Sequence, residues 1–143
     1  MESPLQRPEI LAPAGDKSSF LAALAGGADA VYCGLKHFSA RMAAENFSLS
    51  ELTGLANLAR SKGCKTYVAF NTLLKPQDIQ PAGRLIDRLN RHVRPDALIV
   101  QDLGLIDLAR QIGFSGEIHL STLANVSFGQ ALPLLGKQLP VQR

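Results

Sequence analysis

Short apolar runs alternate with amphipathic segments along this chain. Runs rich in Val, Ile, Leu, Ala and aromatic residues predict five buried β-strands, near residues 9–13, 29–34, 65–70, 97–101 and 117–121. Apolar and polar residues do not alternate within the runs, which is typical of strands covered on both faces. Because helical segments separate them, we expect a parallel sheet with its strands in sequential order.

Capping signals mark the first two helices. Asp16 is placed to cap a helix that ends at Gly26 and Gly27. Ser48 and Glu51 form an S-x-x-E capping box ahead of an apolar stripe. We therefore expect helices to follow the first and second strands.

The later helices are predicted by periodicity. Apolar residues at helical spacing indicate a third helix from about Ile79 to Val93 and a fourth that ends at Gly113. A fifth helix is expected from near Ser127, kinked or split by Pro133. The last residues, PVQR, have the pattern of the start of a sixth strand.

Two architectures compete for this order of elements. A doubly wound nucleotide-binding sheet would carry a glycine-rich fingerprint after its first strand, but the first turn here is P-A-G-D, and no Walker motif occurs. Eight βα units of a barrel need about 250 residues, and five units in 143 residues match that pace. The predicted fold class is therefore a parallel (β/α) TIM-like barrel, incomplete after its first five βα units. Residues 1–143 would be the N-terminal portion of one such domain, truncated near the start of strand six.

Composition and charge narrow the function classes. The chain is 46% apolar and 19% charged, with a mean hydropathy of +0.07, which is typical of a globular protein without a membrane span. The N-terminus has no signal-peptide pattern, so we expect a cytoplasmic protein. A formal charge of +3 argues mildly against tight RNA binding by this portion alone. Arg84, Arg88 and Arg91 fit a solvated helix face better than a nucleic-acid patch.

The candidate site follows from where polar residues fall. Barrel enzymes place their chemistry at the carboxyl ends of the strands. There the sequence has the candidate catalytic residues Asn71, Gln101, Asp102, His119 and Ser121, with Thr122 as a candidate substrate-binding residue. Asp102 could equally cap the fourth helix, and His119 could be a buried structural histidine. No G-x-S-x-G or H-E-x-x-H motif occurs, so neither a serine hydrolase nor a zincin is indicated.

The segment between the second strand and second helix, GLKHFSARMAAENFS, is long for a βα loop. Arg41 within it is a candidate substrate-binding residue, because a guanidinium suits a carboxylate or phosphate. An ion pair of Arg41 with Glu45 is the structural alternative. Cys33 and Cys64 lack C-x-x-C spacing, so we expect no metal site and no iron–sulfur cluster on this chain.

Five motifs in order, EILAPAGD, GGADAVYCGLKHFSARMAAENFS, AFNTL, DALIVQDLGLIDLAR and IHLSTLANVS, together resemble the collagenase-like peptidase family, family U32. The resemblance implies a hydrolase acting on a peptide or protein, with an unassigned catalytic type. Some members of that family instead support hydroxylation of RNA bases or ubiquinone precursors, with an iron–sulfur cluster held by cysteines of the later barrel. A truncated product without activity is a third interpretation. Because a five-stranded barrel portion leaves two open sheet edges, we also expect self-association through them.

Overall fold

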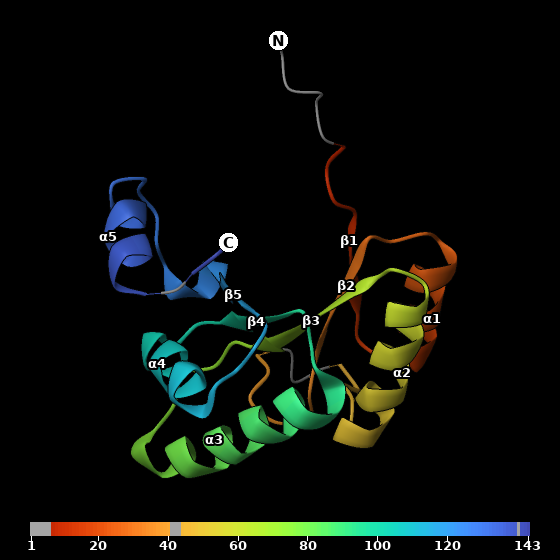
Figure 1. The fold of residues 1–143 in the computed structure, drawn as a ribbon, viewed down its shortest axis with the longest axis horizontal. Coiled ribbons are helices and arrows are strands. Elements are labelled where there is room, and N and C mark those ends of the chain that lie inside the picture. The colour runs from red at the N-terminus through yellow and green to blue at the C-terminus, as the bar shows by residue number, and fades with distance from the viewer. Residues whose placement is uncertain (1–6, 41–43, 140) are drawn as a thin grey trace.

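The computed structural model describes residues 7–40, 44–139 and 141–143, in which strands and helices alternate (Figure 1). The strands are β1 (Leu11–Ala14), β2 (Ala30–Gly34), β3 (Lys65–Phe70), β4 (Ala97–Val100) and β5 (Glu117–Leu120). The α-helices are α1 (Lys17–Ala25), α2 (Leu49–Ser61), α3 (Ile79–Arg88), α4 (Leu103–Ile112) and α5 (Ala131–Gln138). None of the described helices is long and apolar enough to cross a membrane.

The five strands form one open parallel sheet in the order β1-β2-β3-β4-β5. Every neighbouring pair is parallel, so the predicted sequential order and direction are confirmed. In the register, Tyr32, Tyr67, Ala97 and Glu117 stand side by side across β2 to β5. Residues that share such a row point to the same face of the sheet.

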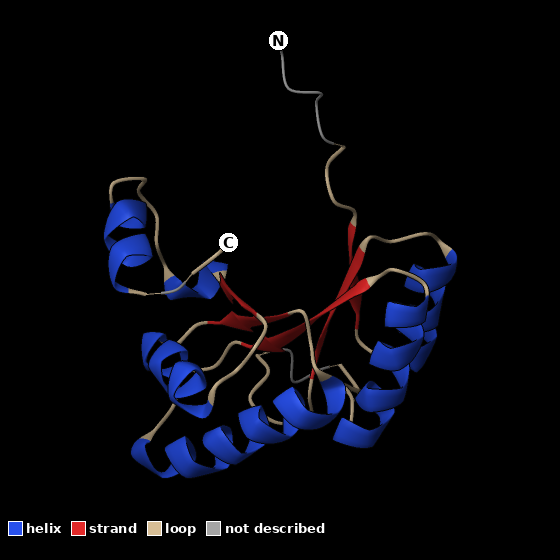
Figure 2. Cartoon of the chain, viewed as in Figure 1, coloured by secondary structure: helices blue, strands red, loops and turns tan. Residues whose placement is uncertain are grey.

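The two faces of the sheet differ in their covering. The helices α1 to α4 lie against one face (Figure 2), where Val31, Val68 and Leu98 pack into the main core. Burying a large apolar side chain there stabilises the fold by about 1.5–3 kcal/mol. The residues one position along, Tyr32, Tyr67 and others, point to the opposite face, which we call the inner face. The inner face carries the smaller cluster Ala30, Tyr67 and Ala97, with Tyr32 and Ile99 packed against it.

The predicted helix starts are confirmed. Asp16 accepts a hydrogen bond from the Ser19 N–H at 2.7 Å and caps α1. The Ser48–Glu51 capping box begins α2, with the Glu51 carboxylate 2.9 Å from the Ser48 N–H. These bonds satisfy amide groups that have no partner inside the helix.

Three later predictions need correction. The third helical segment is not uniform: α3 passes into a π-helical turn, Leu89–Val93, which Arg94 ends in the left-handed conformation. The fifth helix begins at Ala131 rather than near Ser127, and Pro133 lies in its first turn, where a missing N–H breaks no bond. A short 3₁₀ turn, Thr122–Ala124, takes its place after β5.

The last residues lie beside β5 without forming an assigned strand. The Gln142 N–H donates to the Ile118 carbonyl at 2.9 Å, and the Leu120 N–H donates to the Arg143 carbonyl at 2.6 Å. The Gln142 side chain also accepts from the Ile118 N–H at 2.8 Å. These bonds cover part of the β5 edge, as the start of a sixth strand would.

Candidate functional site

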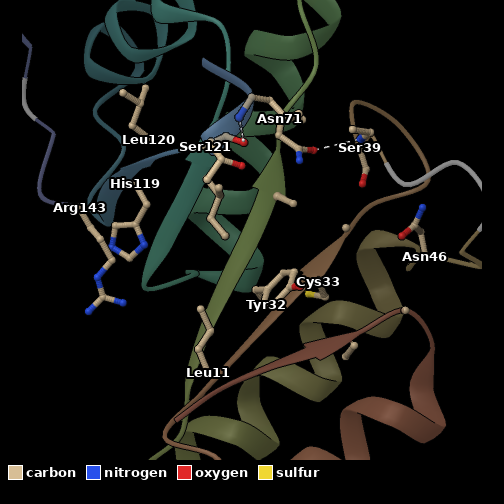
Figure 3. A pocket seen from close by; sticks show the side chains of 18 residues that line it. Leu11, Tyr32, Cys33, Ser39, Asn46, Asn71, His119, Leu120, Ser121 and Arg143 are labelled. Atoms are coloured by element: carbon tan, nitrogen blue, oxygen red, sulfur yellow. Dashed lines mark hydrogen bonds between the residues drawn. The ribbon is translucent and has the colours of Figure 1, made fainter. Parts of the chain in front are cut away.

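A cavity of about 430 Å³ opens on the inner face of the sheet, toward the carboxyl ends of its strands (Figure 3). Its floor is largely apolar, from Leu11, Ala69 and Ile99, and its rim carries amides and hydroxyls. Its lining residues come from all five strands and the loops that follow them: Leu11, Ala14, Gly15, Tyr32, Cys33, Gly34, Ser39, Ala40, Asn46, Ala69, Asn71, Ile99, His119, Leu120, Ser121, Thr122, Leu123 and Arg143. An apolar pocket with a few convergent polar groups is the usual form of a small-molecule site.

Four of the predicted site residues line this cavity together: Asn71, His119, Ser121 and Thr122. Asn71 Oδ1 accepts a hydrogen bond from the Ala40 N–H at 3.0 Å, which ties the end of β3 to the loop after β2. The structure therefore brings the ends of β3 and β5 to one space, as the parallel sheet predicted.

Gln101 and Asp102 do not line the cavity. Gln101 Nε2 donates to the Leu123 carbonyl at 3.2 Å, so it braces the turn after β5. Asp102 caps α4 by accepting from the Gly104 N–H at 2.9 Å, and its second oxygen accepts from the Leu74 N–H at 3.0 Å. The capping interpretation of Asp102 thus describes the structure. Arg41 lies outside the described residues.

Ser121 and Thr122 differ in what their hydroxyls do. Ser121 Oγ accepts from the Leu123 N–H at 3.2 Å and caps the 3₁₀ turn. Thr122 Oγ1 makes no hydrogen bond within the part of the chain that the structure describes. Its hydroxyl is therefore open to a hydrogen bond from a ligand in the cavity.

The loop after β2 is held over the strand ends. The Phe47 N–H donates to the Gly34 carbonyl at 3.0 Å, and Leu35 forms an isolated parallel bridge with Phe47. The Asn46 N–H donates to the Gly15 carbonyl at 2.9 Å. These bonds carry Ser39 and Asn46 into the cavity wall.

An ionic cluster lies near the cavity, around Glu9. Its carboxylate accepts hydrogen bonds from Arg143 Nη1 at 2.8 Å and from the Tyr67 hydroxyl at 2.9 Å, and Lys65 Nζ lies 3.4 Å away. The Arg143 bond is the main reason that the pKa of Glu9 falls from 4.5 to about 2, with Tyr67 and Lys65 acting in the same direction. Burial, and then the Glu9 carboxylate, raise the pKa of Tyr67 to about 12. The cluster links Glu9, which precedes β1, to Arg143, which follows β5.

We expect Glu9→Gln to lower the free energy of unfolding by about 1–2 kcal/mol near pH 7, after allowing for solvent screening. A carboxyl whose pKa is lower in the folded state stabilises the fold above the unfolded pKa of 4.5, and this contribution is lost as the pH falls toward 2. Urea unfolding of the wild-type protein and of Glu9→Gln at about pH 7 and about pH 3 measures the difference between their free energies of unfolding. This difference should shrink at the lower pH. As a control, Asp107→Asn removes an exposed helix carboxylate. If the loss of stability in Glu9→Gln did not change with pH, or equalled the loss in Asp107→Asn, the Glu9 carboxylate would not stabilise the fold as proposed.

The two cysteines are separated and buried. Cys33 pairs with Val68 in the register, whereas Cys64 precedes Lys65, which pairs with Ala30. They therefore sit toward opposite ends of adjacent strands. Burial raises the pKa of the Cys33 thiol to about 12, so it stays protonated near neutral pH and is a poor nucleophile.

The residues do not fit an iron–sulfur cluster. Such a cluster takes three or four cysteine thiolates within bonding reach, and Cys33 and Cys64 cannot share one. Within residues 7–40, 44–139 and 141–143, no group of three or more His, Cys, Asp or Glu side chains is placed to hold a metal ion.

The polar cavity residues Tyr32, Ser39, Asn46 and Arg143 were not among the predicted site residues. The unusual length of the loop after β2 was the available signal for Ser39 and Asn46. Tyr32 faces the cavity because it lies on the inner face of β2, and the sequence of a strand buried on both faces does not show which face that is. Arg143 reaches the cavity through backbone pairing with β5.

A model of peptidase family U32 matches residues 15–140. The chain belongs to peptidase family U32. A solved structure of a U32 peptidase superposes with a TM-score of 0.63 at 12% identity, covering 87% of this chain and 53% of that one, and supports the fold alone.

The similar curated proteins carry two kinds of name. A protein named collagenase, from Porphyromonas gingivalis, is 37% identical over 125 residues, covering 87% of this chain and 30% of the relative. The 23S rRNA 5-hydroxycytidine C2501 synthase of Escherichia coli is 43% identical over 120 residues, covering 84% of this chain and 18% of the relative. The tRNA hydroxylation protein P of Haemophilus influenzae is 39% identical, covering 83% of this chain and 26% of the relative. This chain therefore spans less than a third of each of these relatives.

Proposed function

We propose that this chain supplies the substrate pocket of a U32 enzyme that hydroxylates an RNA base, and that the base enters the cavity on the inner face. The observation that carries the proposal is the chemistry of the lining. It combines amides, hydroxyls, one imidazole, one guanidinium and the Tyr32 ring, and none of its described residues is Asp or Glu. Neutral amides and hydroxyls pair with the edge of a base, aromatic rings stack on its face, and a guanidinium suits a phosphate.

The proposal also concerns the complete fold to which this sheet would belong. We propose that the open sheet is the first five strands of a (β/α)₈ barrel, with α1 to α4 on its outside. Three observations support this: the sequential parallel order, the helices on one face, and the Glu9–Arg143 ion pair of 2.8 Å between the two ends of the sheet. The carboxyl ends of the strands would then be the active-site rim.

Hydroxylation needs an oxygen donor and electrons, and a cluster or other redox group would have to be held outside the described residues. The relatives named as hydroxylation proteins are much longer than this chain. The part proposed for this chain is to bind and orient the base. Asn71, Thr122 and His119 would do so from the ends of β3 and β5.

Peptide hydrolysis is the second candidate, and the likeness to the collagenase favours it. His119 and Ser121 lie on the same wall of the cavity, two residues apart at the end of β5. Proteolysis would need a water or hydroxyl activated there. Yet the Ser121 hydroxyl accepts from the Leu123 N–H, and the His119 ring lies next to Glu117 rather than Ser121.

A ligand titration followed by NMR distinguishes the two candidates. Cytidine or uridine at millimolar concentration should shift the backbone amides of Asn71, Ser121 and Thr122, whereas a capped tripeptide should not. Thr122→Val keeps the shape of the side chain and removes its hydroxyl, so nucleoside affinity should fall about fivefold, the worth of one hydrogen bond. The control Asn57→Ala removes an exposed amide on α2 and should change nothing. Shifts of the cavity amides by the peptide but by neither nucleoside would overturn the RNA proposal in favour of proteolysis.

A further inference from the structure

His119 is a nearly buried imidazole on the wall of the cavity. Only 5% of its side chain is exposed. Its Nε2 lies 2.8 Å from Oε2 of Glu117, two residues earlier on the same face of β5. The Tyr67 ring meets it edge-on, with the ring centroids 4.8 Å apart and an interplanar angle of 78°.

The other ring nitrogen, Nδ1, opens to the cavity. No hydrogen bond joins it to any described residue. Every buried side-chain nitrogen or oxygen of those residues has a hydrogen-bond partner, so a nitrogen without a partner must be exposed. Nδ1 is therefore reached by solvent, and the space that His119 lines is the cavity (Figure 3).

We propose that Glu117 is a positioning residue: it holds neutral His119 in the Nε2–H tautomer, so that Nδ1 presents an acceptor to a hydrogen-bond donor of the bound ligand. An ionised carboxylate only accepts, so the proton of a neutral ring that faces it must sit on Nε2. In its choice of ligand the inference rests on the proposed function: a base carrying an amino group, such as cytosine, offers the N–H donor that Nδ1 requires.

A second set of contacts fixes the ring from behind. Tyr67, whose edge-on ring limits rotation of the imidazole, is itself held by Glu9 at 2.9 Å. Glu9 is in turn bound by Arg143 at 2.8 Å, and the Arg143 guanidinium lies 5.8 Å from the centre of the Tyr67 ring. The imidazole is thus oriented by one carboxylate directly and by a second through Tyr67.

The test is the tautomer of the His119 ring, read from long-range ¹H–¹⁵N correlations of the 143-residue chain without ligand, in alkaline buffer. We expect Nε2–H to predominate, and Glu117→Ala to reduce its ratio to Nδ1–H by about tenfold, the worth of a charge-assisted bond. Glu117→Gln should restore only part of the preference, because its amide can accept from Nε2–H or donate to a bare Nε2. Asp107→Ala removes a similar exposed carboxylate from α4 and should leave the ratio unchanged.

Glu117 is 54% exposed, so its removal should not unfold the chain, and the amide signals of Ile118 and Val100 check this. A wild-type ring in the Nδ1–H form, or an unchanged ratio in Glu117→Ala, would overturn the inference even if nucleosides bind. Should the ratio respond as expected while neither nucleoside shifts the cavity amides, the positioning role stands and the RNA function fails. If cytidine shifts the His119 ring signals more than uridine does, and this difference disappears in Glu117→Ala, both the positioning role and the RNA function are supported.

Discussion

Replacing Phe47 by alanine is expected to lower the free energy of unfolding by about 3–5 kcal/mol, the usual cost of a fully buried phenylalanine. Phe47 is 2% exposed and meets Phe20 of α1 edge-on, with ring centroids 6.0 Å apart. Its backbone also bonds to Gly34 and Lys36 at the end of β2. Loss of the ring therefore removes packing and loosens the loop that carries Asn46 into the cavity.

Urea denaturation measures the loss, and the shift perturbation by nucleoside measures the effect on the site. Phe128→Ala is the matched control, because Phe128 is 62% exposed and its removal should change stability by less than about 0.5 kcal/mol. Equal effects of the two substitutions would show that Phe47 does not anchor the loop.

The fold was largely predictable because its signals are local. Each strand is a short apolar run, and each of the first helices begins with a side chain that binds its own helix amides, Asp16 or Ser48. Parallel order followed from the alternation of strand and helix. The curvature of the sheet is not local, because it depends on packing between residues that lie far apart in the sequence.

The end of the chain shows where local patterns fail. After β5 the sequence STLANVS could begin a helix, but Asn125 adopts the left-handed conformation and ends a single 3₁₀ turn. Ser121 caps that turn, so the next helix is delayed to Ala131. Pro133 then falls in a first turn and is tolerated.

The site was predictable in its location but not in its members. Parallel strands bring their carboxyl ends to one edge, which placed Asn71, His119, Ser121 and Thr122 together. Gln101 was also at that edge, but the chain turns into α4 directly after β4, and its side chain reaches the Leu123 carbonyl instead. Whether a strand-end residue lines a cavity depends on the direction of the next turn.

The loop residues were harder still. Ser39 and Asn46 reach the wall because Phe38 and Asn46 adopt positive φ, 60° and 54°, which fold the loop back over Gly34. The Phe38 ring is held there by stacking on Phe70, with centroids 4.9 Å apart. Hydrophobic periodicity does not predict such a turn. The only signal in the sequence was the unusual length of the loop.

Gly34→Ala is expected to lower the free energy of unfolding by about 1–3 kcal/mol and to weaken nucleoside binding at least as much as Thr122→Val does. Gly34 ends β2 directly beneath the loop. A Cβ at this position would lie 2.9 Å from Ser39 Cβ and 3.0 Å from Asn46 Oδ1, and closer still to Ser39 Oγ. Because the Ser39 side chain is short and its own Cβ is too close, rotation cannot relieve the contact, and the loop backbone must move.

Gly54→Ala is the matched control with the opposite expected sign. Gly54 lies within α2, and an added Cβ there meets no atom within 4 Å. Alanine favours the helix over glycine, so stability should rise by about 0.5–1 kcal/mol with nucleoside binding unchanged. Urea midpoints of the two variants should therefore move in opposite directions. If Gly34→Ala kept both the wild-type midpoint and the wild-type nucleoside shifts, Ser39 and Asn46 would not be packed against β2 and would not form the cavity wall.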